Sequence, residues 1–166
     1  MASIFKNMVP DACYKKFSDI PFEDLFEQGY RTVLLDYDNT LGPDRTTEPT
    51  EYSFEIIKKL KELGFKLCLV SNAKSQRSKG IADALDIPCV TCANKPGIKG
   101  IISAIELTSS DKKECIMVGD QVFTDVIAGK RAGVYTVFVE KFAKKEIWYV
   151  KIKRPFEKLV RIFASF

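Results

Sequence analysis

Short apolar runs alternate with helix-like segments through this 166-residue chain, and this alternation limits the fold more than any other feature. Apolar runs of this length, flanked by turn residues, are typical of strands that are buried on both faces of a parallel sheet. The expected strands are 32–36, 66–70, 89–92, 114–118 and 135–139, and the expected helices are 50–63, 75–85, 98–107 and 122–132. The alternation predicts an α/β fold, a Rossmann-like parallel sheet with helices on both faces.

Two acidic residues, Asp36 and Asp38, follow the first of these runs. In open α/β sheets, reactive groups gather in the crevice beyond the carboxyl ends of the strands. A carboxylate there can attack phosphorus and form an aspartyl-phosphate if Mg²⁺ neutralises the charge of the phosphate. The leading hypothesis is therefore a phosphoryl-transfer site. The alternative is an Asp-rich turn without chemistry, because Asp and Asn are common turn residues.

The ends of three further expected strands favour the phosphoryl-transfer site. Ser71 and Asn72 follow the second strand and offer a hydroxyl and backbone N–H groups to a phosphate oxygen. Lys95 follows the third strand just before a Pro-Gly helix start, and it offers an ammonium group. Asp120 and Asp125 follow the fourth strand and could complete an oxygen-rich Mg²⁺ site. Each signal is weak by itself, but together they form a coherent phosphate and metal site.

This combination resembles the haloacid dehalogenase (HAD) superfamily of phosphatases. More narrowly, it is similar to the YqeG-type branch of HAD subfamily IIIA, which includes phosphatidylglycerophosphate phosphatases. The motifs that carry the resemblance are Asp36-x-Asp38-x-Thr40, Ser71-Asn72, Lys95-Pro96 and Gly119-Asp120-Gln121-x-x-Thr124-Asp125. The motif match spans residues 32 to 140, and the similarity extends to residues 9–11 and to the basic C-terminal segment. Tyr37 departs from the aliphatic residue expected there, at a position outside the chemistry.

The resemblance implies a role for each motif residue. Asp36 would be the nucleophile and a ligand of a Mg²⁺ cofactor. Asp38 would act as general acid and general base, with its backbone carbonyl also on the metal. Asp120 would bind the metal directly, and Asp125 would bind through water or orient Lys95. The implied set is phosphate binding by Ser71, Asn72 and Lys95, and metal binding by Asp36, Asp38, Asp120 and Asp125. The chain contains no His, which excludes histidine-based catalysis and histidine metal sites.

The loops between the motifs are too short for a cap domain. Only about nine polar residues separate Leu41 from the helix expected near Thr50, and one helix and one short strand account for the chain between Asn72 and Lys95. We therefore expect a single capless domain over residues 1–166, with 1–30 as a packed N-terminal extension containing short helices. An uncapped site can admit a large or surface-anchored phosphate ester. Some capless relatives instead form homo-oligomers whose neighbouring subunit covers the site, and this alternative stays open.

The segment 140–166 is basic and rich in aromatic residues. Between Glu140 and Arg161 there are eight basic side chains against three acidic ones, a local balance of +5. A basic amphipathic segment suits an anionic phospholipid surface. The alternative is a helix that packs its apolar side on the sheet, with its Lys and Arg residues in solvent. The charge alone would also permit nucleic-acid binding, but the motifs predict another substrate.

No apolar run approaches the length of a membrane span, and the first residues lack the apolar region of a secretory signal. We therefore expect a cytoplasmic protein, with a peripheral position at the inner face of the membrane as an option. Three functions stay open. The first is Mg²⁺-dependent hydrolysis of phosphatidylglycerophosphate, and the second is the same chemistry on a small soluble phosphate ester or a phosphoprotein. The third is a non-catalytic HAD-fold binding protein, which the complete set of motif residues disfavours.

Overall fold

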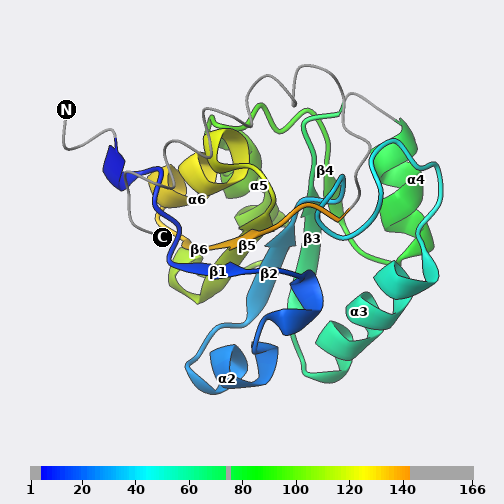
Figure 1. Cartoon of the computed structure of the whole chain (residues 1–166), viewed down its shortest axis with the longest axis horizontal. Coiled ribbons are helices and arrows are strands. Elements are labelled where there is room, and N and C mark those ends of the chain that lie inside the picture. The colour runs from blue at the N-terminus through cyan, green and yellow to red at the C-terminus, as the bar shows by residue number, and fades with distance from the viewer. Residues whose placement is uncertain (1–4, 74–75, 143–166) are drawn as a thin grey trace.

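Six parallel strands form one sheet in the computed structural model, which describes residues 5–73 and 76–142 (Figure 1). The strands are β1 (Ala12–Tyr14), β2 (Thr32–Leu35), β3 (Lys66–Val70), β4 (Cys89–Val90), β5 (Cys115–Gly119) and β6 (Tyr135–Val139). Their order across the sheet is β1-β6-β5-β2-β3-β4. β2 therefore lies in the interior of the sheet between β5 and β3, and all four of its residues are buried.

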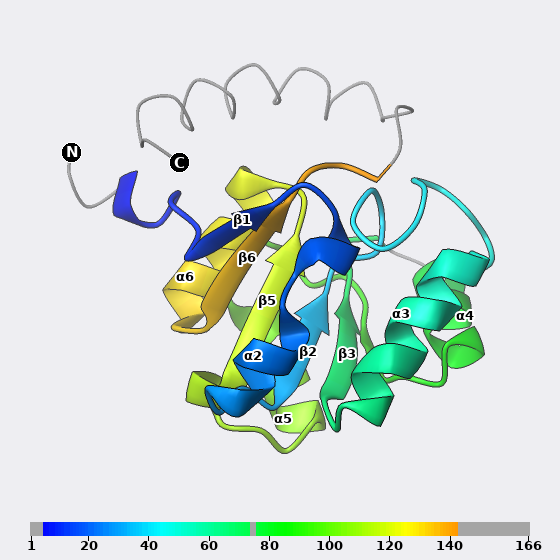
Figure 2. The same ribbon diagram turned by 60° about the horizontal axis from the view of Figure 1, so that its bottom comes forward.

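Helices cover both faces of this sheet, which gives the three layers seen in Figure 2. The helices α2 (Phe22–Glu27), α3 (Glu51–Glu62) and α4 (Gln76–Ala84) lie on one face, and α5 (Lys99–Leu107) and α6 (Ile127–Ala132) lie on the other. Adjacent strand residues point to opposite faces. Thus Val33 and Leu35 of β2 join the core under α2, α3 and α4, whereas Leu34 joins the core under α5 and α6. The predicted α/β fold with a parallel sheet is confirmed.

The expected elements agree with the observed ones in type, and they differ in two places. The expected helix 122–132 is divided, because a π-helical turn (Val122–Val126) precedes α6. The expected strand 89–92 is only two residues long. At Cys92 the backbone is left-handed (φ 51°) rather than extended, so the strand cannot continue through this residue.

The N-terminal extension contains the expected short helices, a 3₁₀ turn (Phe17–Asp19) and α2, but it also contributes a strand that the sequence pattern did not predict. β1 pairs in parallel with β6 at the edge of the sheet. Asp11 anchors this edge, because its carboxylate accepts hydrogen bonds from the backbone N–H and the hydroxyl of Thr136, both at 2.8 Å. Lys130 donates to the same carboxylate. A three-residue strand is too short to show a hydrophobic period.

Between β2 and α3 the described chain forms neither a helix nor a strand. The β-structure there consists of one isolated bridge between Asp38 and Gly42. No helix of the described residues is both long enough and apolar enough to cross a membrane. Most of the basic segment 140–166 lies outside the described residues, so its amphipathic character and its role at a lipid surface stay predictions. The single capless domain and the homo-oligomer also stay predictions.

Candidate active site

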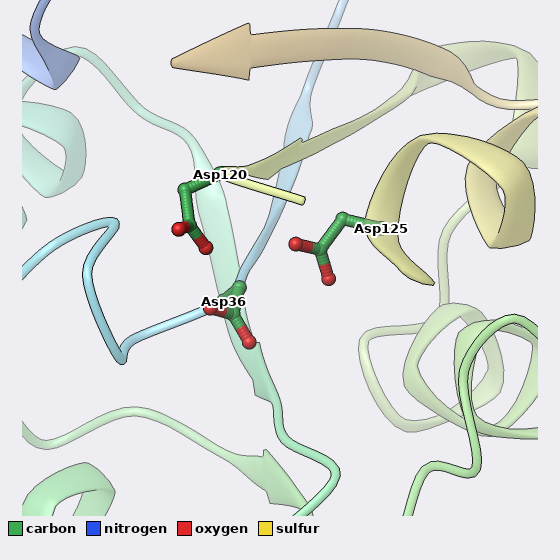
Figure 3. Close-up of side chains that lie close together, drawn as sticks. All are labelled: Asp36, Asp120 and Asp125. Atoms are coloured by element: carbon green, nitrogen blue, oxygen red, sulfur yellow. The ribbon is translucent and has the colours of Figure 1, made fainter. Parts of the chain in front are cut away.

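Three acidic side chains converge where β2 and β5 end. Asp36 directly follows β2, and its backbone N–H donates to the carbonyl of Val118 in β5 at 3.0 Å. Asp120 directly follows β5, and Asp125 lies in the π-helical turn. Figure 3 shows the three carboxyl groups turned toward one another, and an oxygen of each lies within 4.8 Å of an oxygen of the other two. The topology thus brings together three of the predicted metal ligands that are up to 89 positions apart in sequence.

Lys95 holds this cluster together from the end of the third predicted strand. Its ammonium donates to Asp36 Oδ1 at 2.9 Å, to Asp125 Oδ1 at 2.6 Å and to the carbonyl of Val70 at 2.7 Å. An ammonium group has three N–H donors, so protein acceptors use all three. Burial works against the charged form, but Asp125 and Asp36 outweigh it and raise the pKa of Lys95. Lys95 is therefore a fully buried, permanently charged cation.

The cluster carries more negative than positive charge. Lys95 pairs with two of the three carboxylates, Asp36 and Asp125, so one ammonium group faces two carboxylates. Burial raises the pKa of Asp36 to about 7, with Lys95 acting in the opposite direction and Asp125 adding to the rise. Carboxylate oxygens at this mutual distance are the ligands that Mg²⁺ prefers. The residues present therefore fit a divalent cation.

The loop after Asp36 adds two polar groups, the Thr40 hydroxyl and the Asn39 side-chain oxygen, next to the cluster. The hydroxyl of Thr40 lies 3.3 Å from Asp36 Oδ2 and 3.4 Å from Asp120 Oδ1, so it bridges the ends of β2 and β5. Asn39 Oδ1 is buried, and it accepts no hydrogen bond within the part of the chain that the structure describes. Buried acceptors normally have a partner. Asn39 therefore offers an acceptor for water or a ligand next to the acidic cluster.

Ser71 follows β3, and its hydroxyl oxygen accepts hydrogen bonds from the backbone N–H of Ala73 at 3.1 Å and from the Ser78 hydroxyl at 3.0 Å. Among the described residues no acceptor takes the hydroxyl proton of Ser71, so this proton is free to meet a phosphate oxygen. Asn72 instead braces Lys95: its side-chain oxygen accepts from the Lys95 N–H at 2.8 Å, and its side-chain nitrogen donates to the Lys95 carbonyl at 3.0 Å.

Asp38 lies apart from the acidic cluster. Its carboxylate is not one of the three that converge, and it forms a bidentate ion pair with Arg77 of α4, with N–O distances of 2.9 and 2.5 Å. Sequence reasoning did not identify Arg77. A lone basic residue in the first turn of a helix is ordinary, so the sequence carries no signal for this pairing. The roles of the predicted site residues stay predictions.

Gly119, the last residue of β5, is required by the packing of Asp125. A Cβ atom at Gly119 would overlap the carboxyl group of Asp125. We expect Gly119→Ala to displace Asp125 from Lys95 and to lower phosphatase activity by about tenfold or more, since misplacing a catalytic group by about 1 Å can cost 10²-fold. The measurement is phosphate release, with the melting temperature as a check of folding. Gly80→Ala is the matched control, because open space surrounds that glycine. Equal activity of Gly119→Ala and wild type would show that Asp125 does not need this position.

Comparisons with known proteins agree with this geometry. Residues 3–143 match the family of the mitochondrial PGP phosphatases. The chain is 31% identical over 155 residues to the probable phosphatase YqeG of Bacillus subtilis (strain 168), covering 93% of this chain and 90% of that protein. It is 28% identical to phosphatidylglycerophosphate phosphatase 1, chloroplastic/mitochondrial, of Arabidopsis thaliana, covering 84% of this chain and 42% of that protein.

The fold is also that of a solved phosphatase. The crystal structure of a HAD phosphatase from Thermococcus onnurineus superposes with a TM-score of 0.51 at 16% sequence identity, covering 76% of this chain and 97% of that one. The motifs, the sheet with its convergent acidic residues and the family match all agree. The chain has the fold of a HAD phosphatase. It therefore belongs to the family of the mitochondrial PGP phosphatases, and it is a phosphoric monoester hydrolase.

Proposed function

We propose that the protein hydrolyses a phosphomonoester with the help of Mg²⁺ through an aspartyl-phosphate on Asp36, and that its substrate is phosphatidylglycerophosphate. The observation that carries the chemistry is the convergence of Asp36, Asp120 and Asp125, with the buried ammonium of Lys95 paired to Asp36 and Asp125. Asp36 is the best candidate for the nucleophile, because it combines this setting with a side chain that is 13% exposed to solvent.

The proposed reaction has two steps. In the first, an Asp36 oxygen attacks phosphorus, the P–O bond to the alcohol breaks, and Asp38 gives its proton to the leaving oxygen. In the second, Asp38 takes a proton from water, whose oxygen attacks phosphorus and releases inorganic phosphate and Asp36. Ser71 donates a hydrogen bond to the phosphoryl group, and Lys95 holds Asp36 in place. Asp38 must leave Arg77 before it can reach the substrate.

Mg²⁺ would be held by Asp36, Asp120 and Asp125, with the Asp38 backbone carbonyl as a further ligand. When bound, it neutralises charge on the phosphoryl oxygens. Without a cation, the excess negative charge of the cluster repels an anionic substrate. Two residues of the chain hold the carboxylates in place. Thr40 links Asp36 to Asp120, and Lys95 links Asp36 to Asp125.

The lipid substrate is supported by two observations. The family match covers residues 3–143, and one relative bears the name of a phosphatidylglycerophosphate phosphatase. The loop between β2 and α3 contains no helix or longer strand in the described chain, which agrees with a site open to a large substrate. The basic segment 140–166 would add attraction to an anionic membrane.

The test compares phosphate release from phosphatidylglycerophosphate in mixed micelles with release from p-nitrophenyl phosphate. We expect Mg²⁺ to be required for both substrates and kcat/KM to be higher for the lipid. Mg²⁺ should also raise the melting temperature, since it binds the folded carboxylate cluster but not the unfolded chain. Ca²⁺ in place of Mg²⁺ is the control for a general effect of divalent charge. Activity in excess EDTA would contradict the metal-dependent mechanism. A higher kcat/KM for the soluble ester would contradict the lipid assignment and favour a small phosphate ester.

A further inference from the structure

Arg77 is a charged residue that the proposed reaction does not use. It lies in the first turn of α4, where its guanidinium donates to both carboxylate oxygens of Asp38. The same Nη1 atom also donates to the Thr46 carbonyl at 3.0 Å. These contacts fix the guanidinium against the loop that carries both motif aspartates. The Arg77 side chain therefore contacts one proposed catalytic residue, Asp38, but it is not part of the cluster of Asp36, Asp120 and Asp125.

Arg77 differs from Lys95 in its remaining hydrogen-bond capacity. A guanidinium group has five N–H donors, and the contacts of Arg77 with Asp38 and Thr46 use three of them. Lys95 uses all three of its donors within the protein. Arg77 also has access to solvent, with 21% of its side chain exposed against 1% for Lys95. Among the residues that the structure describes, two N–H donors of Arg77 have no acceptor, whereas every donor of Lys95 has one, so an anion that enters the site can bind Arg77.

The partner of Arg77 resembles an anionic ligand. The planar guanidinium forms the same bidentate pair with a phosphate as with a carboxylate. The Asp38 carboxylate, with 26% of its side chain exposed, occupies this position in the structure. The Asp38 carboxylate is not one of the three carboxylates whose oxygens lie within 4.8 Å of one another. A group that binds Arg77 in place of this carboxylate would therefore lie away from the phosphorus that Asp36 attacks.

We propose that Arg77 binds a second anionic group of the substrate, a phosphodiester, and that this group takes the place of the Asp38 carboxylate. The proposal rests on the proposed function, because it names the part of the substrate beyond the reacting phosphomonoester. The exchange has a consequence for catalysis. Binding of the phosphodiester releases Asp38 from its ion pair, so Asp38 becomes available for proton transfer only when a substrate of the right class is bound. Arg77 is thus a specificity-determining residue.

The test uses two soluble substrates with the same reacting group. Glycerol 3-phosphate carries a phosphomonoester alone, whereas glycerophosphoglycerophosphate carries the monoester and a phosphodiester. We expect Arg77→Gln to raise KM for glycerophosphoglycerophosphate by about tenfold or more, the scale of a lost charge-assisted bidentate pair, and to change KM for glycerol 3-phosphate little. Arg77→Lys keeps the positive charge but not the planar guanidinium that binds bidentately, so its KM for glycerophosphoglycerophosphate should lie between those of wild type and Arg77→Gln. Arg45→Gln is the control for a lost positive charge, because the Arg45 side chain is 68% exposed.

A binding measurement separates this inference from the proposed function. Calorimetry with glycerophosphoglycerol, which contains only the phosphodiester, should show binding to the wild-type protein and about tenfold weaker binding to Arg77→Gln, whether or not the protein turns over either ester. Loss of all turnover in wild type together with this binding difference would overturn the proposed function alone. Equal binding by the two proteins, or an equal rise of KM for both substrates, would overturn the role of Arg77. The melting temperatures of both Arg77 variants check that they fold.

Discussion

Replacement of Asp36 by Asn is expected to abolish phosphate release, with a loss in kcat of about 10⁴-fold or more, the scale seen when a covalent nucleophile is removed. The amide keeps the shape of the carboxyl group but cannot form the acyl phosphate. It also removes one negative charge from the cluster of Asp36, Asp120 and Asp125. The measurement is single-turnover phosphate release at saturating Mg²⁺.

The control for this substitution is Asp83→Asn, which removes an exposed carboxylate on α4. It should leave turnover unchanged. Trapping of a phosphorylated protein with a slow substrate, followed by mass spectrometry, should place the added phosphate on Asp36 in the wild type and on no residue in Asp36→Asn. Turnover at the wild-type rate in Asp36→Asn would exclude the covalent mechanism.

Replacement of Lys95 by Met is expected to lower the free energy of unfolding by about 3–5 kcal/mol in EDTA, because removal of one partner from a buried ion pair leaves charge uncompensated. Asp36 and Asp125 would lose their counter-charge, and the Val70 carbonyl would lose its donor. Mg²⁺ should reverse part of this loss, since a bound cation replaces the missing positive charge. The measurement is urea unfolding with and without Mg²⁺.

The matched control is Lys58→Met, at a lysine whose side chain is 77% exposed on α3. That change should alter the free energy of unfolding by no more than about 0.5 kcal/mol, as is usual for surface positions. Mg²⁺ should bind Lys95→Met more tightly than wild type, because the ammonium no longer competes for Asp36 and Asp125. If Lys95→Met unfolded at the same urea concentration as wild type in EDTA, the ammonium would not stabilise the cluster.

The strand ends explain why much of the site could be predicted. Apolar runs identified the central strands, and the residue after each run had to lie at the carboxyl edge of a parallel sheet. The apolar pattern therefore predicted that Asp36, Ser71 and Asp120 lie at one edge of a parallel sheet, and the structure confirms that sheet. It did not predict β1, because a strand of three residues leaves no periodic pattern.

The sequence pattern did not predict which side chains pair with one another in the site. The sequence assigned Lys95 to phosphate binding, with Asp125 as a residue that could orient it, and the phosphate role stays a prediction. It did not predict that all three donors of Lys95 would meet protein acceptors, Asp36, Asp125 and the Val70 carbonyl. The sequence assigned the backbone carbonyl of Asp38 to the metal, which stays a prediction, and it carried no signal for the pairing of the Asp38 carboxylate with Arg77 of α4. These pairings depend on the orientation of helix and loop backbones that are distant in sequence, and no periodicity encodes that orientation.

The sequence by itself therefore determined the succession along the chain of strands β2 to β6 and of the helices between them, the edge of the sheet that carries the chemistry and the types of residue found there. Each of these follows from local hydrophobic patterning and from the geometry that all parallel sheets share. Only the tertiary structure decided which of the charged groups touch. It paired Lys95 with Asp36 and Asp125, and Arg77 with Asp38. Ion pairing in a buried site depends on distances of a few ångströms between elements that come from separate parts of the chain.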